Sequence, residues 1–140
     1  METVIVGANE SETASKAVER AGEVAARMDA RLVVVTAYGF DEVTEVGIGG
    51  DRFRISTAAQ ALEFAETTAA RLSASYGVDA SGVAWTGKPE KVLLDAAAQF
   101  GASVIFVGNV RMQGAGRLLG SVANHLAHHS PCDVFIVKTV

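Results

Sequence analysis

The sequence has very little cysteine and no long hydrophobic run. Cys132 is the single cysteine among 140 residues, so no intramolecular disulfide can form. Nothing therefore implies an oxidising compartment. No apolar run reaches the roughly 18 residues that a membrane-spanning helix needs. The first residues, Met1-Glu2-Thr3, lack the charge pattern of a signal peptide. We therefore expect a soluble cytoplasmic protein that does not bind membranes.

The common catalytic motifs are also missing. There is no Gly-Lys-Ser of a P-loop and no Gly-x-Ser-x-Gly pattern of a nucleophile elbow. A Ser-His-acid group assembled from distant residues stays open at this point, but Ser121 has a simpler role in a ligand-binding loop. We expect a protein that is not an enzyme.

Positive charge is scarce over most of the chain. Twelve Lys and Arg side chains stand against 16 Asp and Glu, which gives a formal net charge of -4. This balance argues against a general nucleic-acid binder, which is usually basic. After Ile105 the balance reverses, because Arg111, Arg117 and Lys138 face only Asp133. This part of the chain therefore favours an anionic ligand.

The length and the 49% apolar content suit a single domain over residues 1–140 with a proper core. Apolar runs predict five short strands, at 4–6, 32–35, 83–85, 103–107 and 134–137. Apolar residues at helical spacing predict helices at 14–28, 58–72 and 92–100, and a last one ending near His129. Ser11 is a predicted N-cap, Pro89 suits a first helical turn, and Gly77 and Gly101 end helices. The stretch 39–54 shows no period and is predicted to be a long loop.

Strands that alternate with helices predict an α/β fold: one doubly wound domain with a five-stranded parallel sheet and helices on both faces. In the strand order 3-2-1-4-5, the order reverses between strands 1 and 4. Ligands of such sheets bind at the carboxyl ends of the strands at that point. The turns after these two strands begin at Gly7 and Gly108.

The second of these turns is a glycine-rich stretch from Gly108 to Ser121 that contains four glycines and two arginines. Glycine allows close approach of the backbone to a ligand, and the following helix N-terminus offers free N–H groups to a phosphate. Ser121 can cap that helix or donate its hydroxyl to an anion. The alternative is a surface loop without a ligand, and residue types alone do not decide between the two.

Several motifs together resemble the universal stress protein family. The C-terminal stretch with Gly108, Gly116, Gly120 and Ser121 is similar to that family's Gly-x-x-Gly, nine residues, Gly-Ser or Gly-Thr hallmark. Val4-Ile5-Val6-Gly7-Ala8-Asn9-Glu10-Ser11 is similar to its opening Val-x-Val-Gly-x-Asp-Gly-Ser, and Gly87-Lys88-Pro89 to its Gly-x-Pro. The ending Ser130-Pro131-Cys132-Asp133-Val134 is similar to its last turn and edge strand. The resemblance covers nearly the whole chain.

The resemblance implies a binding site for an adenine nucleotide such as ATP, AMP or cyclic AMP, with Mg²⁺ as a candidate companion. It implies these nucleotide-binding residues: Gly7, Ala8, Asn9, Ala37, Gly108, Asn109, Arg111, Gly116, Arg117, Gly120, Ser121 and Val122. Ala37, just past the second strand, matches the position whose backbone meets adenine. For Arg117, exposure to solvent is the competing interpretation. The resemblance also implies a homodimer formed through the C-terminal edge strand.

The sequence departs from the family pattern around this site. Asn9 stands where the family has an aspartate that binds ribose, and Glu10 replaces a glycine. Arg111 replaces the second glycine of the hallmark, and the loop from Gly108 to Gly120 is one residue shorter. The carboxylate of Glu10 would repel phosphates, whereas Arg111 either offers a charged fork to a phosphate or blocks a backbone contact.

The expected function is therefore a stress-response sensor or regulatory module that binds an adenine nucleotide. Two alternatives stay open: a protein-interaction module of the same fold that no longer binds nucleotide, and a weak ATPase. His125, His128 and His129 lie at i, i+3 and i+4, but a metal site is not expected without a cysteine or carboxylate beside them. Cys132 is expected to be buried as a small apolar residue.

Overall fold

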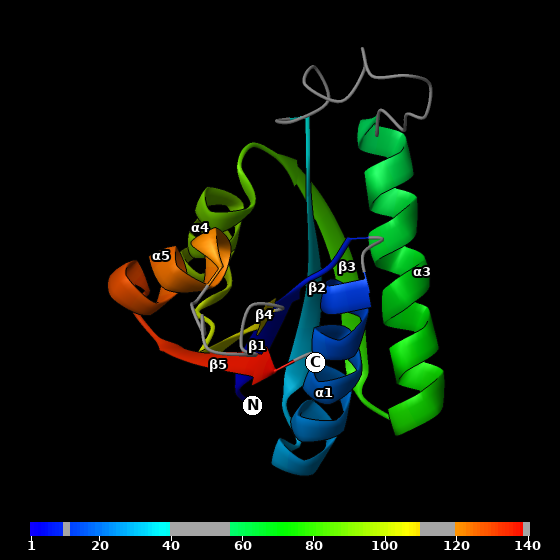
Figure 1. Ribbon diagram of the computed structural model, residues 1–140. Helices are drawn as coiled ribbons and strands as arrows, with labels where there is room; N and C mark the ends of the chain where they lie inside the picture. Colours follow the sequence, from blue (N-terminus) through cyan, green and yellow to red (C-terminus); the bar gives the residue numbers. More distant parts are fainter. Residues whose placement is uncertain (10–11, 40–56, 110–119, 139–140) are drawn as a thin grey trace.

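The structure is a computed structural model that describes residues 1–9, 12–39, 57–109 and 120–138 (Figure 1). The strands in the described part are β1 (Thr3–Gly7), β2 (Arg31–Tyr38), β3 (Asp79–Thr86), β4 (Val104–Asn109) and β5 (Asp133–Lys138). The helices there are α1 (Glu12–Met28), α3 (Ala58–Tyr76), α4 (Pro89–Phe100) and α5 (Ser121–His129). The predicted alternation of strands and helices is confirmed.

The five strands form one parallel sheet in the order β3-β2-β1-β4-β5. β1 lies in the middle, where Val4 pairs with Leu32 of β2 and with Val104 of β4. This confirms the predicted doubly wound α/β domain and its strand order. The order reverses between β1 and β4, which is where such folds bind ligands.

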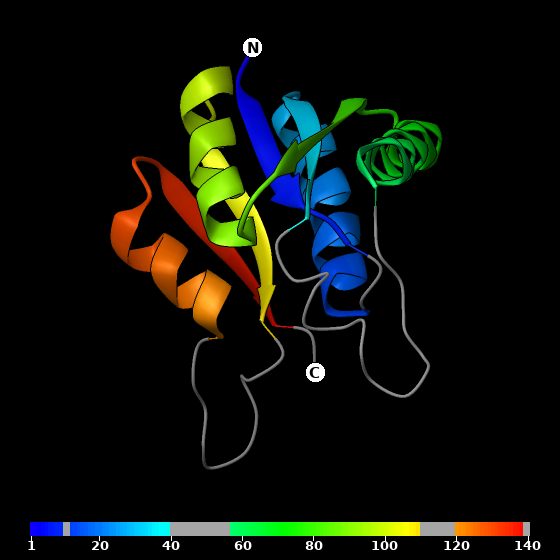
Figure 2. The same cartoon turned by 90° about the horizontal axis from the view of Figure 1, so that it is seen from above.

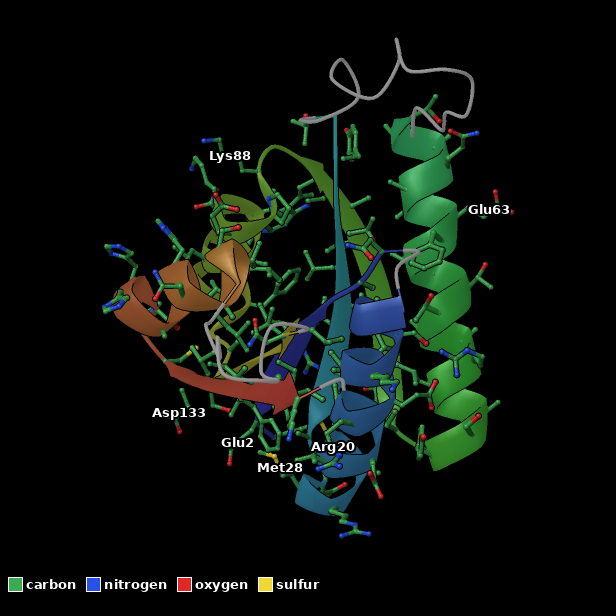
Figure 3. The ribbon with its side chains drawn as sticks, in the orientation of Figure 1. Glu2, Arg20, Met28, Glu63, Lys88 and Asp133 are labelled. Atoms are coloured by element: carbon green, nitrogen blue, oxygen red, sulfur yellow. The ribbon has the colours of Figure 1, made fainter. Side chains whose placement is uncertain are left out.

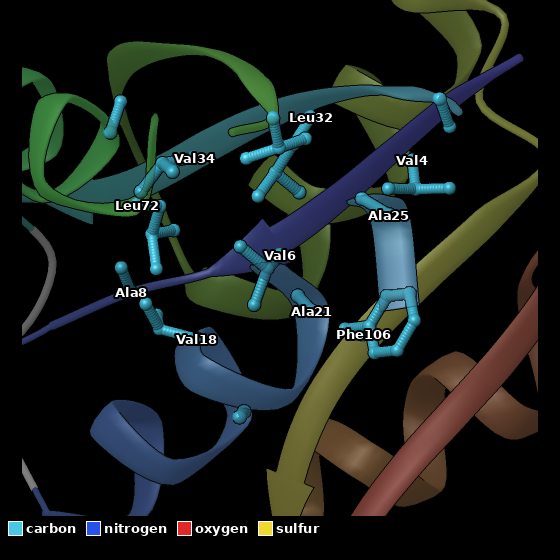
Figure 4. Close-up of a cluster of buried hydrophobic side chains, with 14 of the residues drawn as sticks. Val4, Val6, Ala8, Val18, Ala21, Ala25, Leu32, Val34, Leu72 and Phe106 are labelled. Carbon is cyan, nitrogen blue, oxygen red and sulfur yellow. The ribbon is translucent and has the colours of Figure 1, made fainter. Parts of the chain in front are cut away.

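Helices cover both faces of the sheet, α1 and α3 on one and α4 and α5 on the other (Figure 2). Successive side chains of a strand point to opposite faces, so each strand supplies both cores. On β1, Val4 and Val6 pack toward α1 while Ile5 packs toward α4 and α5. Figure 4 shows Val4, Val6 and Phe106 beside α1 in the first of these cores.

The helix ends follow the sequence signals closely. Thr57 caps α3 in a complete capping box: its Oγ1 accepts the Gln60 N–H at 3.1 Å, and its own N–H donates to Gln60 Oε1 at 2.9 Å. Gly77 and Gly101 end α3 and α4 in the left-handed conformation, at φ 72 and 63. Pro89 occupies the first turn of α4, as predicted.

Several predicted boundaries are wrong because strands extend beyond their β-branched cores. β3 begins at Asp79 rather than at residue 83, since it pairs along all eight residues of β2. Ala37 lies inside β2 rather than just past it. β4 begins at Val104 and includes Gly108 and Asn109, both predicted as loop.

The start of the last helix also differs from the prediction. Ser121 is the first residue of α5 and not its cap, because Gly120 holds the N-cap position. Cys132 is half-buried rather than fully buried, with its Sγ 3.5 Å from Ser130 Oγ. The predicted N-cap Ser11 and almost all of the predicted 39–54 loop lie outside the described residues; Gly39 is described, at φ 89.

Candidate functional site

A cavity of about 210 Å³ lies at the carboxyl ends of β1 and β4, where the strand order reverses. Its lining residues are Gly7, Ala8, Asn9, Ala14, Val35, Ala37, Pro89, Val92, Leu93, Val107, Gly108 and Val122. Lys88, which follows β3, lies at this edge of the sheet. Figure 3 shows it far from Glu2 and Asp133, which lie at the amino ends of β1 and β5. The cavity is thus where the topology predicted a ligand site.

The wall of the cavity is apolar. Val35 and Ala37 come from β2, and Leu93 comes from α4 on the face above them. Gly7 allows α4 to come close, because a Cβ at this position would lie 3.1 Å from Leu93 Cδ1. Small-molecule sites are usually lined mostly by apolar side chains with a few polar groups that fix orientation. The cavity has this composition, and Asn9 is the polar side chain among its described lining residues.

Two helices begin at the cavity without a side-chain cap. Neither Gly120 before α5 nor Lys88 before α4 makes a capping hydrogen bond with its side chain. Val122 in the first turn of α5 and Pro89 in the first turn of α4 both line the cavity. The first N–H groups of a helix have no partner inside the helix, and the positive end of its dipole attracts anions. This arrangement suits a ligand that carries phosphate.

The two ends of the glycine-rich stretch meet through a side chain. The Gly120 N–H donates to Asn109 Oδ1 at 2.6 Å. Asn109 ends β4 and is only 2% exposed, so its carboxamide is held inside the protein. The bond joins the end of β4 to the start of α5 across a sequence separation of 11.

The first turn of the site is tied to β2. The Ala8 N–H donates to the Val35 carbonyl at 2.9 Å, which extends the β1–β2 pairing by one residue. Ala8 is buried, whereas Asn9 is exposed at the edge of the cavity. An asparagine here presents both a donor and an acceptor without a charge.

The structure brings six of the predicted site residues together around the cavity: Gly7, Ala8, Asn9, Ala37, Gly108 and Val122. Gly120 and Ser121 lie beside it at the start of α5, and Asn109 lies behind Gly120. Arg111, Gly116 and Arg117 lie outside the described residues. The binding role of all these residues stays a prediction.

Sequence reasoning missed the apolar half of the cavity. Val92 and Leu93 were predicted as the buried face of a helix, which they are, but not as a wall of the site. Val107 directly precedes Gly108, the first glycine of the hallmark, and this position could have indicated that it lines the site. Pro89 gave a second signal, because a proline in the first helical turn places that turn at the carboxyl edge of the sheet.

Other polar groups lie away from the cavity. His125 and His129 share a face of α5, with ring centroids 4.4 Å apart. Within the described part of the chain, no three His, Cys, Asp or Glu side chains come together as a metal site would need. None of the helices described is long and apolar enough to cross a membrane.

Comparisons with known proteins all lead to one family. A sequence model described as the universal stress protein family matches residues 1–138. A universal stress protein of Mycobacterium tuberculosis (strain ATCC 25618 / H37Rv) is 30% identical over 141 residues, which cover 98% of this chain and 96% of the relative.

Solved structures agree with this match. The crystal structure of a universal stress protein in complex with cAMP is 32% identical, with a TM-score of 0.72 over 99% of this chain and 98% of that one. The universal stress protein from Archaeoglobus fulgidus in complex with dAMP has a TM-score of 0.67 at 19% identity, over 99% of this chain and 98% of that one. At that identity the second likeness shows the fold alone.

Proposed function

The chain belongs to the universal stress protein family, and we propose that it binds an adenine nucleotide between β1 and β4 and acts as a stress-response sensor or regulatory module. The observation that carries this proposal is the uncapped N-terminus of α5, which opens onto an apolar cavity at the point of strand-order reversal. A relative that is 32% identical forms a complex with cAMP. We place this function in the cytoplasm, as the sequence predicts.

The cavity offers different surroundings to the two ends of a nucleotide. The base would lie against the apolar wall made by Val35, Ala37 and Leu93. The phosphate would lie at the start of α5, near the Ser121 hydroxyl and the N–H groups of the first turn. Asn9 would then hydrogen-bond to the ribose in place of the aspartate that the family uses. No described lining residue carries a negative charge that would oppose the phosphate.

A nucleotide with few charges fits this proposal better than ATP. Glu10 follows Asn9 in the sequence and adds a negative charge to the first turn. Coulomb repulsion from this carboxylate grows with the charge of the ligand. We therefore propose that cyclic AMP or AMP is preferred over ATP.

Any Mg²⁺ would be bound mainly by the ligand. Magnesium prefers carboxylate oxygens, phosphates and water. The described lining residues include no Asp or Glu, so phosphate oxygens and water would supply the coordination shell. This composition also gives no general base to activate a water, which supports a binding role rather than strong catalysis.

Thermal unfolding with and without ligand tests the proposal. A ligand at a hundredfold excess over its Kd adds about 2.7 kcal/mol to the stability of the protein that binds it. We expect cyclic AMP and AMP to raise Tm by several degrees, ATP to raise it less, and GMP to have little effect. If no adenine nucleotide raises Tm, the protein is better explained as a protein-interaction module that has kept the fold. Release of phosphate from ATP above a heat-denatured control would indicate the weak ATPase instead.

We also propose that two copies pair through β5. This strand is the edge of the sheet next to β4. It is apolar from Val134 to Val137, and Phe135, at 37%, is the large apolar side chain that is exposed on the strands described. Unpaired edges of this kind invite pairing with another chain. Pairing of identical edges about a two-fold axis would be antiparallel and self-complementary.

A further inference from the structure

Asn109 is a polar side chain in a buried place. It is 2% exposed at the end of β4, and burial of an amide is unfavourable unless the amide is hydrogen-bonded. Its Oδ1 accepts the Gly120 N–H at 2.6 Å. A Cβ on Gly120 would lie 3.0 Å from the same oxygen, so the two residues are in direct contact. The bond is therefore a tight, interior link between β4 and α5.

This link fixes the residue from which α5 starts. Gly120 is the N-cap of α5 and has no side chain with which to cap the helix. Its N–H is donated to Asn109, and its carbonyl accepts the Asn124 N–H at 2.8 Å. Both backbone groups of Gly120 are thus used inside the protein. The N–H groups of Ser121 and Val122 follow it in the first turn, where no carbonyl of the helix can accept them.

We propose that Asn109 is a positioning residue for the anionic group of the ligand, an inference that rests on the proposed function. Asn109 holds Gly120, so that the N–H groups left without an acceptor in the helix begin with that of Ser121, and it keeps this start of α5 in place. Val122 and Gly108 both line the cavity, so the donors are positioned at its edge. In this arrangement Asn109 acts through Gly120 and does not itself contact the nucleotide, although the family resemblance included it among the binding residues.

The neutral amide at position 109 matters for the ligand. An aspartate could accept the same Gly120 N–H, but it would place a negative charge at the helix end that attracts the anion. Asparagine supplies the acceptor without that competition. The substitutions Asn109→Ala and Asn109→Asp therefore separate two effects. The first removes the link, and the second retains the link but adds the charge.

The link is tested first on the protein without ligand. We expect amide hydrogen exchange, followed by NMR, to show strong protection of the Gly120 N–H in the wild type and in Asn109→Asp. In Asn109→Ala the same amide should exchange at least about tenfold faster, because a hydrogen bond to it is lost. A wild-type Gly120 amide without protection, or one unchanged by Asn109→Ala, would overturn the link. This measurement needs no nucleotide, so it does not depend on the proposed function.

The positioning role is tested by calorimetric titration with AMP and adenosine, which differ by the phosphate. Asn109→Ala should lower the affinity for AMP by about tenfold more than the affinity for adenosine, the size expected for a misplaced charge-assisted hydrogen bond. Asn109→Asp should lower AMP affinity selectively as well, while keeping Gly120 protected. Val78→Ala is the matched control, because Val78 is 5% exposed in the core on the α1 face, just before β3 at the strand ends opposite the cavity, and it is not among the lining residues. It should leave the AMP-to-adenosine ratio unchanged.

These experiments distinguish a failure of the positioning role of Asn109 from a failure of the proposed nucleotide binding. If Asn109→Ala weakens AMP and adenosine equally, Asn109 is a structural residue and the positioning role is wrong. If the wild type binds no adenine compound, the proposed function and the positioning role fail together, and the exchange experiment still decides whether the Asn109–Gly120 link exists.

Discussion

Gly82 of β3 lies directly against the backbone of Ala65 in α3: a Cβ on Gly82 would be 2.4 Å from the Ala65 carbonyl carbon. The same Cβ would lie 2.7 Å from the Glu66 nitrogen. These are main-chain atoms, so no side-chain rotation can relieve the contact. Gly82 therefore sets how closely α3 packs on the sheet.

We predict that Gly82→Ala destabilises the protein by about 3 kcal/mol, at the upper end of overpacking costs, because α3 must move as a whole. Urea denaturation measures the change. Gly101→Ala is the control: its Cβ would meet nothing within 4 Å, and only its φ of 63 opposes a side chain. We expect that variant to lose only about 1 kcal/mol, the cost of a side chain in the left-handed conformation. Similar losses in the two variants would contradict the importance of the close approach.

Gly120→Val should weaken nucleotide binding strongly while the protein still folds. The valine side chain would enter the space at the start of α5, and its Cβ would press on Asn109 Oδ1 at 3.0 Å. We expect the affinity for cyclic AMP to fall by at least about tenfold, or 1.4 kcal/mol, with a normal circular dichroism spectrum. Equal binding by wild type and variant would show that the ligand site is elsewhere.

Glu10→Gly should improve ATP binding selectively. Removing one negative charge from the first turn reduces repulsion most for the ligand with the most charges. Isothermal titration with ATP, AMP and cyclic AMP would give the ratio of affinities in both proteins. An unchanged ratio of ATP to AMP affinity would show that Glu10 does not set the choice of ligand.

Glu19 should make a small contribution to stability that depends on pH. Burial alone would raise the pKa of Glu19, but hydrogen bonds from Tyr76 and Arg71 outweigh it and lower the pKa from 4.5. A depressed folded-state pKa stabilises the protein above the unfolded pKa, and this stabilisation disappears as the pH falls through the folded value. The side chain is 41% exposed, so we expect Glu19→Gln to lose less than about 1 kcal/mol at neutral pH.

The comparison is made by urea denaturation at neutral pH and again in acid, at about pH 3. The difference between wild type and Glu19→Gln should shrink in acid. Glu63→Gln, on the outer face of α3, is the control and should show little effect at either pH (Figure 3). A difference that grows in acid would contradict the sign of the pKa shift.

Ile136→Pro should convert the proposed dimer to a monomer. The Asp133 N–H donates to the Ser103 carbonyl at 3.3 Å, so the alternation along a parallel strand directs the Phe135 and Val137 N–H groups toward β4 as well. The Ile136 N–H then points to the open edge, and a proline there leaves the bonds to β4 intact. Phe135→Pro would break one of these inner bonds and serves as the destabilising control.

Light scattering at micromolar concentration decides the mass. The wild type should have twice the 14.5 kDa of one chain, and Ile136→Pro should have the mass of one chain with little change in Tm. A wild-type monomer would refute the dimer. A dimer that survives Ile136→Pro would place the interface on another surface.

The alternation of strands and helices predicted a parallel, doubly wound sheet with right-handed crossovers, and the expected order 3-2-1-4-5 is a common order of such folds. The sequence did not predict the first half of β3, because Asp79, Ser81 and Gly82 have poor strand propensity. That half is strand because β2 offers a full-length partner and because Gly82 allows α3 to cover it. Tertiary contact overrides propensity at these positions.

The sequence predicted the loop residues of the candidate site but not the residues of its apolar wall. Gly7 and Gly108 follow from the ends of strands, which a sequence shows. The contact of Leu93 with Gly7, and the burial of Asn109 against Gly120, depend on how α4 and α5 pack on the sheet. No local pattern in the sequence encodes these distances. The glycines in the sequence were therefore enough to predict where the site lies. The hydrogen bond between Asn109 and Gly120 became visible only in the packed structure.

The contrast between the capped α3 and the uncapped α4 and α5 has a consequence for how stability is distributed. Thr57 and Gln60 close the start of α3 within the chain itself. The N-cap residues of α4 and α5, Lys88 and Gly120, make no capping bond with their side chains, although Asn109 accepts the Gly120 N–H, and both helix starts border the cavity. A phosphate bound at the start of α5 would therefore serve as an N-cap supplied by the ligand, and this helix would fray least when the nucleotide is abundant. The concentration of the nucleotide would thus determine how rigid the face with α4 and α5 is. The helices α1 and α3 on the other face would keep the same rigidity.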